Sequence, residues 1–482
     1  MEPSASSPLI GVPPLCYTQD LRPRERAGRH AVIVTDLGYG DAGKGSITDW
    51  LCRHLSAHTV IRYNGGAQAA HNVVTDDGRA HTFAQFGSGS FISGVRTVLS
   101  RHMLIEPFAL FNEAAHLDQL GVRDSFARLF IDRHALIITP FHAAANRLRE
   151  LGRGDARHGS CGMGIGETVA DALTFPDLTI TAGMLPDTAA IRKRLWQVYE
   201  AKREQIAPLL LLSSEHPSAA PSMDVFRHPS DVIDAAAETY AELAQCATLI
   251  GTDELGAIFS APGAVIFEGA QGVLLDQDYG FAPYHTWSKT TPANALDLLT
   301  ENGFSGDVTR LGVLRTYFTR HGAGPFVTED HALADCLAEA HNAQSAWQGA
   351  FRVGWFDAVA AKYALEVSGG VDGIALTHLD RLASVQSWQI GIGYQADRPS
   401  SDLDRFFAHR DGLISAIRVP TPADLAHQTA LAQQLFQCTP IYAAVAADPA
   451  AYADAIESTL KVPVIVTSQG SRPFDKRVRV CV

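Results

Sequence analysis

A glycine-rich segment at residues 38–46 holds the residues best suited to chemistry. It reads Gly-Tyr-Gly-Asp-Ala-Gly-Lys-Gly-Ser and follows the apolar run Ala31–Thr35. Glycines let backbone N–H groups close around phosphate oxygens, the start of a following helix adds positive potential, and Lys44 would neutralise a terminal phosphate. The segment nearly fits the pattern G-x-x-x-x-G-K-[ST], but Gly45 stands where a hydroxyl residue would hold magnesium. Asp41 is therefore the nearest candidate for a metal ligand or a base.

A second polar segment, residues 62–72, follows another apolar run. It reads Arg-Tyr-Asn-Gly-Gly-Ala-Gln-Ala-Ala-His-Asn. A strand that ends in a double glycine places His71 at or beside a loop at the sheet edge, where ligands bind in α/β folds. Taken alone, His71 is more often a structural histidine, and the first segment could be a turn that only joins a strand to a helix.

The elements that must position these segments follow from the apolar patterns. Runs rich in β-branched residues alternate with longer helical patterns, which predicts an α/β fold. We expect a large single domain, with a mostly parallel central β-sheet flanked by helices and a P-loop-like phosphate loop after the first strand. The expected strands are Ala31–Thr35, Thr59–Tyr63, Leu136–Thr139, Val265–Glu268, Leu311–Phe318, Gly373–Thr377 and Val464–Thr467. The expected helices lie near Ser46–Leu55, Leu104–Leu117, Phe141–Leu151, Asp231–Leu249, Ala332–Ala340 and Trp355–Val367.

Other parts of the chain have weaker patterns. Residues 1–29 are interpreted as a poorly ordered N-terminal extension before a single domain of residues 30–482. Residues 202–230 and 395–435 contain several prolines and are interpreted as peripheral elaborations of that domain.

Composition excludes several classes of protein. The chain carries 39 Lys and Arg against 52 Asp and Glu, a net charge of −13, which is too acidic for a protein that coats nucleic acid. Apolar residues make up 46%, enough for a large core. The 7 cysteines are odd in number and never spaced as CxxC, so we expect neither a disulfide framework nor a zinc site. The N-terminus does not resemble a signal peptide and no apolar run is long enough to span a membrane, which predicts a cytoplasmic protein.

The two polar segments together resemble the adenylosuccinate synthetase family, whose pattern is QWGDEGKG followed by GGxNAGH. Other stretches fall in the family's order: FEGAQG at 267–272, LLD at 274–276, TRHGAGPFVTE at 319–329, GWFD at 354–357, THLD at 377–380 and TSQG at 467–470. The resemblance covers roughly residues 30–480, which it identifies as a catalytic domain.

The resemblance implies a GTP-dependent ligase of purine biosynthesis. Such an enzyme phosphorylates the 6-oxygen of inosine monophosphate (IMP), or a similar purine nucleotide, and joins the amino group of aspartate to C6. Asp41 matches the catalytic aspartate that takes the proton from purine N1, and His71 matches the histidine that donates to the 6-oxygen. The resemblance assigns Mg²⁺ to Asp41 and Ala70 and implies a homodimer.

The resemblance also assigns the two nucleotide sites. The GTP side comprises Gly40, Gly43, Lys44, Gly45, Thr377, Asp380, Ser468 and Gly470. Asp380 would accept hydrogen bonds from guanine N1–H and the 2-amino group, although it could instead form a strand-end turn. The acceptor side comprises Gln68, Ser160, Cys161, Gln271, Thr290 and Arg352, where Gln271 could instead be a buried glutamine bonded to backbone.

The departures from the family pattern lie on the acceptor side. Before Gly354, the arginine-rich GRxRR loop is replaced by a stretch with the single arginine Arg352. One guanidinium can clamp only one carboxylate, so a monocarboxylate or another amine fits as well as aspartate. Residues 159–167 match the family segment GTTGRGIGP but lack its arginine. Residues 171–175 lack the arginine that, in the family, reaches across the dimer into the partner's site. Three hypotheses remain: a divergent synthetase, a paralogue with a different amine or acceptor, and a GTP-binding protein without ligase activity.

Overall fold

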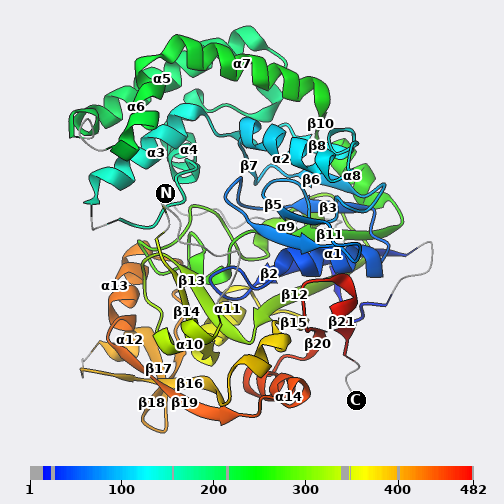
Figure 1. Ribbon diagram of the computed structural model, residues 1–482, viewed down its shortest axis with the longest axis vertical. Helices are drawn as coiled ribbons and strands as arrows, with labels where there is room; N and C mark the ends of the chain where they lie inside the picture. The colour runs from blue at the N-terminus through cyan, green and yellow to red at the C-terminus, as the bar shows by residue number, and fades with distance from the viewer. Residues whose placement is uncertain are drawn as a thin grey trace.

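The computed structural model describes residues 15–22, 28–154, 157–212, 217–337, 347, 349–398 and 402–479. At its centre lies an 11-stranded sheet in the order β10-β8-β6-β3-β11-β2-β12-β15-β20-β21, with β1 paired to β12 (Figure 1). Its pairings are parallel except that between β20 and β21. The strands are β1 (Cys16–Tyr17), β2 (Arg29–Asp36), β3 (Thr59–Arg62), β6 (Arg96–Leu99), β8 (Leu129–Asp132), β10 (Thr248–Ile250), β11 (Gly263–Glu268), β12 (Asp307–Arg315), β15 (Gly373–Thr377), β20 (Val464–Ser468) and β21 (Lys476–Val478). The predicted α/β class with a mostly parallel sheet is confirmed, although the phosphate loop follows β2 because the short β1 precedes it.

A second, mixed sheet lies beside the first. Its order is β13-β14-β16-β18-β17, with β19 paired to β16. It comprises β13 (Tyr317–His321), β14 (Phe351–Asp357), β16 (Trp388–Ala396), β17 (Phe407–Arg410), β18 (Leu413–Ile417) and β19 (Cys438–Val445). Two small pairs complete the strands: β4 (His71–Val74) with β5 (Ala80–Phe83), and β7 (Leu104–Ile105) with β9 (Leu136–Ile137).

Helices flank the central sheet and form a layer of their own at one end of the molecule. The helices α3, α5, α6 and α7 pack on one another at the top of Figure 1. The helices are α1 (Lys44–His54), α2 (Pro107–Gln119), α3 (Pro140–Gly152), α4 (Ile165–Thr174), α5 (Thr188–Leu212), α6 (Ala220–Arg227), α7 (Pro229–Cys246), α8 (Thr252–Ser260), α9 (Ala293–Glu301), α10 (His331–Cys336), α11 (Ala358–Val367), α12 (Leu403–Phe406), α13 (Leu425–Leu435) and α14 (Pro449–Leu460). In the described part of the chain no helix is long and apolar enough to cross a membrane.

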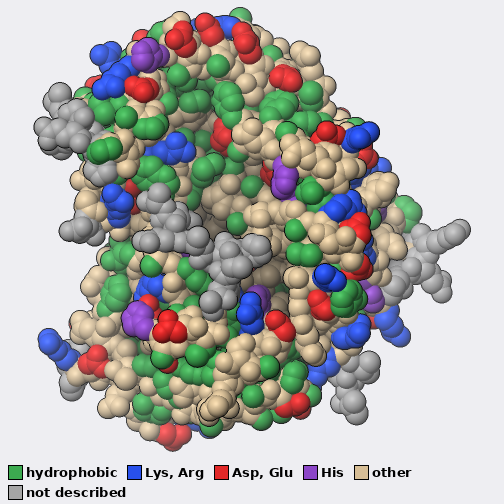
Figure 2. Space-filling model, viewed as in Figure 1, with side chains coloured by type: hydrophobic (Ala, Val, Ile, Leu, Met, Phe, Trp, Pro, Cys, Tyr) green, Lys and Arg blue, Asp and Glu red, His purple; other side chains and the backbone are tan. Residues whose placement is uncertain are grey.

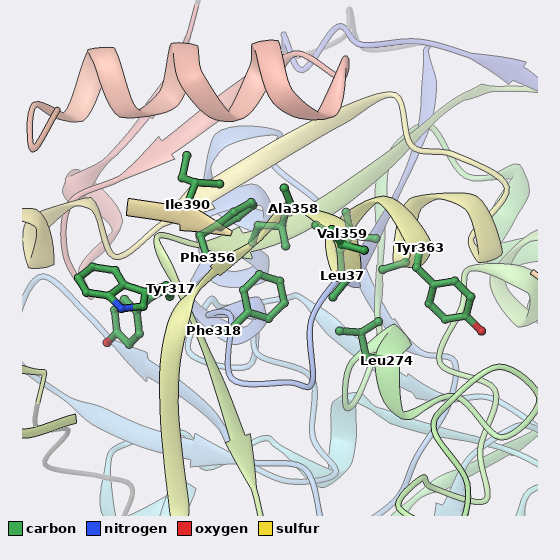
Figure 3. Close-up of a cluster of buried hydrophobic side chains, with 14 of the residues drawn as sticks. Leu37, Leu274, Tyr317, Phe318, Phe356, Ala358, Val359, Tyr363 and Ile390 are labelled. Carbon is green, nitrogen blue, oxygen red and sulfur yellow. The ribbon is translucent and has the colours of Figure 1, made fainter. Parts of the chain in front are cut away.

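The core beneath the phosphate loop joins the two sheets. Leu37, Phe318, Phe356 and Val359 are buried together, with Tyr363 at the far side of the same cluster (Figure 3). Burial of such side chains stabilises the fold by about 1.5–3 kcal/mol each. Leu37 directly precedes the glycine-rich segment, so this core fixes the point from which the loop leaves β2.

Several predicted boundaries are wrong for local physical reasons. The run Leu311–Phe318 is two strands, because the chain leaves the central sheet after β12 and enters the second sheet as β13. The helix expected from Leu104 begins at Pro107, where Glu106 caps the backbone N–H groups of Phe108 and Ala109. Likewise, Asp357 caps α11, so Trp355 belongs to β14 and not to the helix.

Other predictions failed because the pattern was weak. Residues 136–139 form only the short β9, outside the central sheet. Residues 202–230 contain the end of α5 and all of α6, and residues 395–435 contain two strands of the second sheet, so neither is merely peripheral. The helix expected at Ala332–Ala340 ends at Cys336, and residues 338–340 lie outside the described residues.

The N-terminal boundary stays a prediction. Residues 1–14 and 23–27 lie outside the described residues. Within the part that is described, Cys16–Tyr17 pairs with β12 and Leu21 is buried.

Candidate functional site

One large cavity of about 1060 Å³ lies at the carboxyl ends of β2, β3, β11, β15 and β20. This is the edge at which ligands bind in parallel α/β sheets. In Figure 2 the surface is hollowed near the middle of the molecule, and charges of both signs are scattered over this face. The predicted residues that line the cavity are Gly40, Asp41, Gly43, Lys44, Gly45, Gln68, Ala70, His71, Ser160, Cys161, Gln271, Thr377, Asp380, Ser468 and Gly470.

The phosphate loop is held in shape by a buried ion pair. Lys44 begins α1, and its Nζ lies 2.8 Å from Asp36 Oδ2 at the end of β2. The same carboxylate accepts from Gly38 N at 2.8 Å and Ala42 N at 3.0 Å. Asp36 therefore fixes both the turn of the loop and the lysine that faces the cavity.

Gly45 departs from the usual phosphate-loop pattern for a steric reason. A Cβ built there would lie 2.7 Å from Cβ of His71, closer than side chains pack. The glycine therefore lets the start of α1 approach the strand that carries His71. This close approach brings the loop and the histidine to one wall of the cavity.

Asp41 sits in the loop with a left-handed backbone, φ +59°. Its Oδ2 lies 3.0 Å from His321 Nε2 on β13, and both side chains are partly exposed to the cavity. Burial alone would raise the pKa of Asp41, but His321, Lys44 and Arg315 together lower it. Asp41 is therefore a carboxylate at neutral pH, able to bind a cation or accept a proton.

His71 is oriented by a buried acid. Its Nδ1 lies 2.6 Å from Glu268 Oε1, and Glu268 also accepts from Ser88 N at 2.9 Å. Burial lowers the pKa of His71 to about 4, against the opposing effect of Glu268. Because Nδ1 is engaged by the acid, Nε2 is the nitrogen that can reach a ligand.

Two glutamines at the same wall have unsatisfied amide atoms. Among the described residues, Gln68 Nε2 and Oε1 and Gln271 Oε1 are buried without a hydrogen-bond partner. Gln271 also has a left-handed backbone, φ +56°. Buried amides without partners are rare in proteins, and their position in the cavity wall points to a ligand with complementary donors and acceptors.

The end of the cavity beside β15 and β20 is built from two loops. Thr377 Oγ1 donates to Ala42 O at 2.7 Å, which ties β15 to the phosphate loop. Asp380 follows with its carboxylate about two-fifths exposed. Lys476 Nζ donates to Gly470 O and Arg472 O, both at 3.0 Å, and so closes the loop after β20.

Two predicted acceptor residues do not line the cavity. Thr290 is buried, with its N–H 2.6 Å from Asp276 Oδ2 and its Oγ1 3.0 Å from Gly272 O. Arg352 pairs with Glu329 through two nitrogens and donates to Gly322 O at 3.1 Å and Gly324 O at 2.9 Å. All three guanidinium nitrogens have partners within the chain, and Arg352 does not line the cavity; its role toward a substrate carboxylate stays a prediction.

The structure also brings residues to the cavity that the sequence patterns did not single out. They include Asn146, Arg149, Arg153, Arg320, His321 and Trp287. Arg149 lies in the helix predicted at Phe141–Leu151, and Arg153 follows four residues later, just beyond its predicted end; that spacing could have indicated a shared face. His321 lies in a stretch that was matched to the family, but nothing local to it indicated a contact with Asp41.

The cavity lacks a protein-only metal cage in the part of the chain that is described. No three His, Cys, Asp or Glu side chains there come together as metal ligands. Asp41 and Ala70 nonetheless lie on the same wall. Mg²⁺ is commonly held by one or two carboxylates together with water and phosphate oxygens, so such a site needs no third acidic ligand.

The fold and the cavity define a class: an α/β nucleotide-binding protein in which a phosphate loop, an acid and a carboxylate-paired histidine meet in one site. Sequence comparison gives the particular family. The family model described as "Adenylosuccinate synthetase" matches residues 33–475. The adenylosuccinate synthetase of Vibrio vulnificus is 34% identical over 378 residues, 76% of this chain and 81% of that protein. That of Mycobacteroides abscessus is 32% identical over 376 residues, with the same coverage. The chain belongs to the adenylosuccinate synthetase family, whose members are GTP-dependent ligases that form a C–N bond.

Solved structures support the fold. The fully ligated adenylosuccinate synthetase from Plasmodium falciparum superposes with a TM-score of 0.73 at 20% identity, over 93% of this chain and 99% of that one. The succinoaminodeoxyadenylate synthetase of cyanophage S-2L, bound to dGMP and dATP, has a TM-score of 0.56 at 16% identity, over 94% and 95%.

Proposed function

We propose that this protein uses GTP to phosphorylate the 6-oxygen of a purine nucleotide and then displaces that phosphate with an amine. Adenylosuccinate synthesis from IMP and aspartate is the reaction that the family membership supports directly. As for other members, the expected setting is a homodimer in the cytoplasm. The observation that carries the proposal is that Asp41, His71 and the unsatisfied amides of Gln68 and Gln271 share one cavity with the phosphate loop.

The residues divide the chemistry as follows. Asp41, ionised at neutral pH, takes the proton from purine N1 and so makes the 6-oxygen nucleophilic. In its protonated form His71 donates from Nε2 to that oxygen, while Glu268 accepts from Nδ1–H and stabilises the charge of the imidazolium. Lys44 and the amides of the loop hold the transferred phosphoryl group in line. Asp380 accepts from guanine N1–H and the 2-amino group, which selects GTP over ATP.

Magnesium fits the donors of this site. Asp41 offers a carboxylate and Ala70 a backbone carbonyl, and oxygen atoms are the ligands that Mg²⁺ prefers. When bound, the ion neutralises charge on the phosphoryl group during its transfer.

The test is phosphate release from GTP by the wild type and Asp41→Ala. We expect IMP and aspartate to stimulate release by the wild type, and the variant to lose release while it still binds GTP. Release at the wild-type rate in the variant would remove Asp41 from the mechanism. Stimulation by neither IMP nor dGMP, with any amine, would contradict ligase activity.

A second candidate concerns the amine. Arg352 is occupied by Glu329, and the sequence 338–348 contains no Lys or Arg. A dicarboxylate needs more than one cationic partner to offset its desolvation. We therefore include monocarboxylate amino acids and simple amines beside aspartate in the assay; a preference for one of them would identify an altered member of the family.

A further inference from the structure

The carboxylate of Asp41 has one hydrogen-bond partner among the described residues, the imidazole of His321. Nε2 of His321 lies 3.0 Å from Oδ2 of Asp41, and both side chains line the cavity, 25% and 29% exposed. A carboxylate can only accept, so Nε2 carries the hydrogen and donates. Because an ionised carboxylate offers about four lone-pair sites, this bond leaves Oδ1 free to accept from a ligand.

His321 ends β13 in a rigid frame. It is paired with Phe351 on β14, and the two rings pack with their centroids 5.0 Å apart. Two arginines hold the turn that follows β13. Arg320 donates to the carbonyls of residues 323 and 325, and Arg352 to those of residues 322 and 324, at 2.9 to 3.1 Å. The imidazole therefore leaves the sheet from a fixed point.

The backbone of the phosphate loop is tied to the same part of the chain. Arg320 is buried with its guanidinium 4.4 Å from the centre of the Tyr39 ring, and the Tyr39 hydroxyl donates to Pro325 O at 3.2 Å. Arg315, at the end of β12, donates to the backbone oxygen of Asp41 at 3.1 Å. The left-handed φ of +59° at Asp41 needs such support, because this conformation is unfavourable for a residue other than glycine. With its backbone fixed, only the carboxylate remains to be oriented.

The contact with His321 provides that orientation. The terminal torsion of an aspartate is broad, so a carboxylate without a partner turns over a wide range. Proton transfer needs the accepting oxygen at about 2.6–3.2 Å from the atom that gives up the proton. A hydrogen bond from a fixed imidazole to Oδ2 selects one orientation before the acceptor binds, which reduces the entropy lost on reaching the reactive geometry.

We propose that His321 is a positioning residue for the first step of the proposed reaction, holding Oδ2 of Asp41 so that Oδ1 faces the hydrogen on purine N1. The inference rests on the proposed function and adds a residue to its mechanism. In that step the proton moves from N1 to Oδ1, and the electron pair of the N1–H bond shifts through C6 to the 6-oxygen. That oxygen forms its bond to the γ-phosphorus as the bond from this phosphorus to GDP breaks. His321 keeps its hydrogen throughout.

The experiment uses variants that separate the donor of His321 from its ring. His321→Phe keeps a ring against Phe351 and loses the donor, and His321→Met is a second variant without a donor. His321→Gln loses the ring and keeps an N–H donor. The control is His409→Phe on β17, which breaks another contact between a histidine and an acid of the second sheet region, 3.1 Å from Asp404, away from the residues that line the cavity.

Two measurements are made with GTP, IMP and aspartate. Phosphate release gives kcat and KM. Oxygen-labelled GTP with IMP alone reports phosphoryl transfer, because GDP formed in the site can turn its β-phosphate before the step reverses, which moves the label out of the bridging position. Misplacing a reacting group by about 1 Å can cost about 100-fold in rate, so we expect both rates to fall roughly 10- to 100-fold in His321→Phe and His321→Met.

The other expected results separate positioning from binding and packing. The KM for GTP and for IMP should change by less than about threefold, since an interaction that acts in the transition state lowers kcat and kcat/KM together. His321→Gln should keep most of the activity, and His409→Phe should behave as the wild type.

Three results would overturn the inference while the proposed function stands. The first is a wild-type rate in His321→Phe, or in His321→Met if circular dichroism shows that the first variant does not fold. The second is an equal loss in His321→Gln and His321→Phe, which would assign the effect to packing against Phe351. The third is a fall in phosphate release without a fall in label movement, which would place His321 in the amine step. If the wild type releases no phosphate with IMP or dGMP and any amine, the proposed function fails and the inference fails with it.

Discussion

Replacing Glu268 with Gln tests whether the acid beside His71 contributes to catalysis. Glu268 ends β11 fully buried and contacts His71 Nδ1 at 2.6 Å. Burial alone would raise the pKa of Glu268, but His71 and Arg62 lower it, so the group is ionised. The substitution keeps the shape of the side chain and removes its charge.

The size of the effect follows from this one contact. A hydrogen bond to a charged group contributes about 1.5–3 kcal/mol, against about 0.5–1.5 kcal/mol for a neutral pair. Glu268→Gln should therefore destabilise the positively charged imidazole of the transition state by about 1–2 kcal/mol. Since about 1.4 kcal/mol is a factor of ten in rate, we expect kcat to fall roughly 5- to 30-fold. GTP binding should change little, because in the described part of the chain Glu268 forms its hydrogen bonds with His71 and Ser88 and not with the phosphate loop.

The assay is phosphate release at saturating GTP and acceptor, in a double-mutant cycle with His71→Asn. If Glu268 acts through His71, its substitution has little further effect in the His71→Asn background. Fully additive losses would refute the reasoning, since they would place the role of Glu268 elsewhere, for example in holding Ser88. A wild-type kcat in Glu268→Gln would refute it as well.

Three further predictions concern stability and specificity. Burial raises the pKa of Asp357 to about 6, so the folded state holds its proton more tightly than the unfolded state, and this stabilisation is present below pH 4 and lost as the pH rises through 6. Asp357→Asn keeps the helix cap and should raise the unfolding free energy at pH 7.5 by about 1–3 kcal/mol, less the hydrogen bond that the Tyr394 hydroxyl loses. Denaturant titrations that show no gain over the wild type would contradict this prediction. Asp380→Asn should narrow the preference for GTP over ATP in competition assays, and equal use of both by the wild type would remove Asp380 from guanine recognition. Arg352→Met should lower the free energy of unfolding by about 1–3 kcal/mol, and Glu329→Gln should lower it by less, because each removes one partner of the ion pair. A rise in KM for the amine without a loss of stability would instead show that Arg352 binds the substrate.

The sequence predicted those parts of the site whose functional residues are consecutive or nearly consecutive in the chain. The loop from Gly38 to Gly45 contains the glycines of the turn together with Asp41 and Lys44, so the segment alone was enough to predict that these groups lie in one site. The strands that support it are continuous apolar runs, because parallel strands are buried on both faces. The apolar runs also placed Thr377 and Ser468 at or just after the ends of two strands, the resemblance assigned both to the GTP side, and the structure shows that the two strands are neighbours.

The residues missed by the sequence reasoning act across distances that no local pattern records. His321 contacts Asp41 because the chain passes from the central sheet to the second sheet between β12 and β13. The apolar run 311–318 is continuous across this point, so the sequence predicted one strand there. Arg352 was assigned to the substrate because its spacing matched the family loop. Its partner, Glu329, lies in a different stretch that the same comparison had matched without assigning it a role.

The pairing of cations with the chain's own acids explains how an acidic protein can bind anions. Lys44 is held by Asp36, and Arg149 and Arg153 by carboxylates on α3 and α4. Each acid cancels part of the long-range attraction for a phosphate, which is consistent with a net charge of −13. What remains is a set of N–H donors fixed in direction, and directed donors discriminate between ligands by geometry more than by charge. Affinity at such a site should depend less on ionic strength than affinity at a cluster of unpaired lysines, because the paired cations are partly buried and their net charge is small.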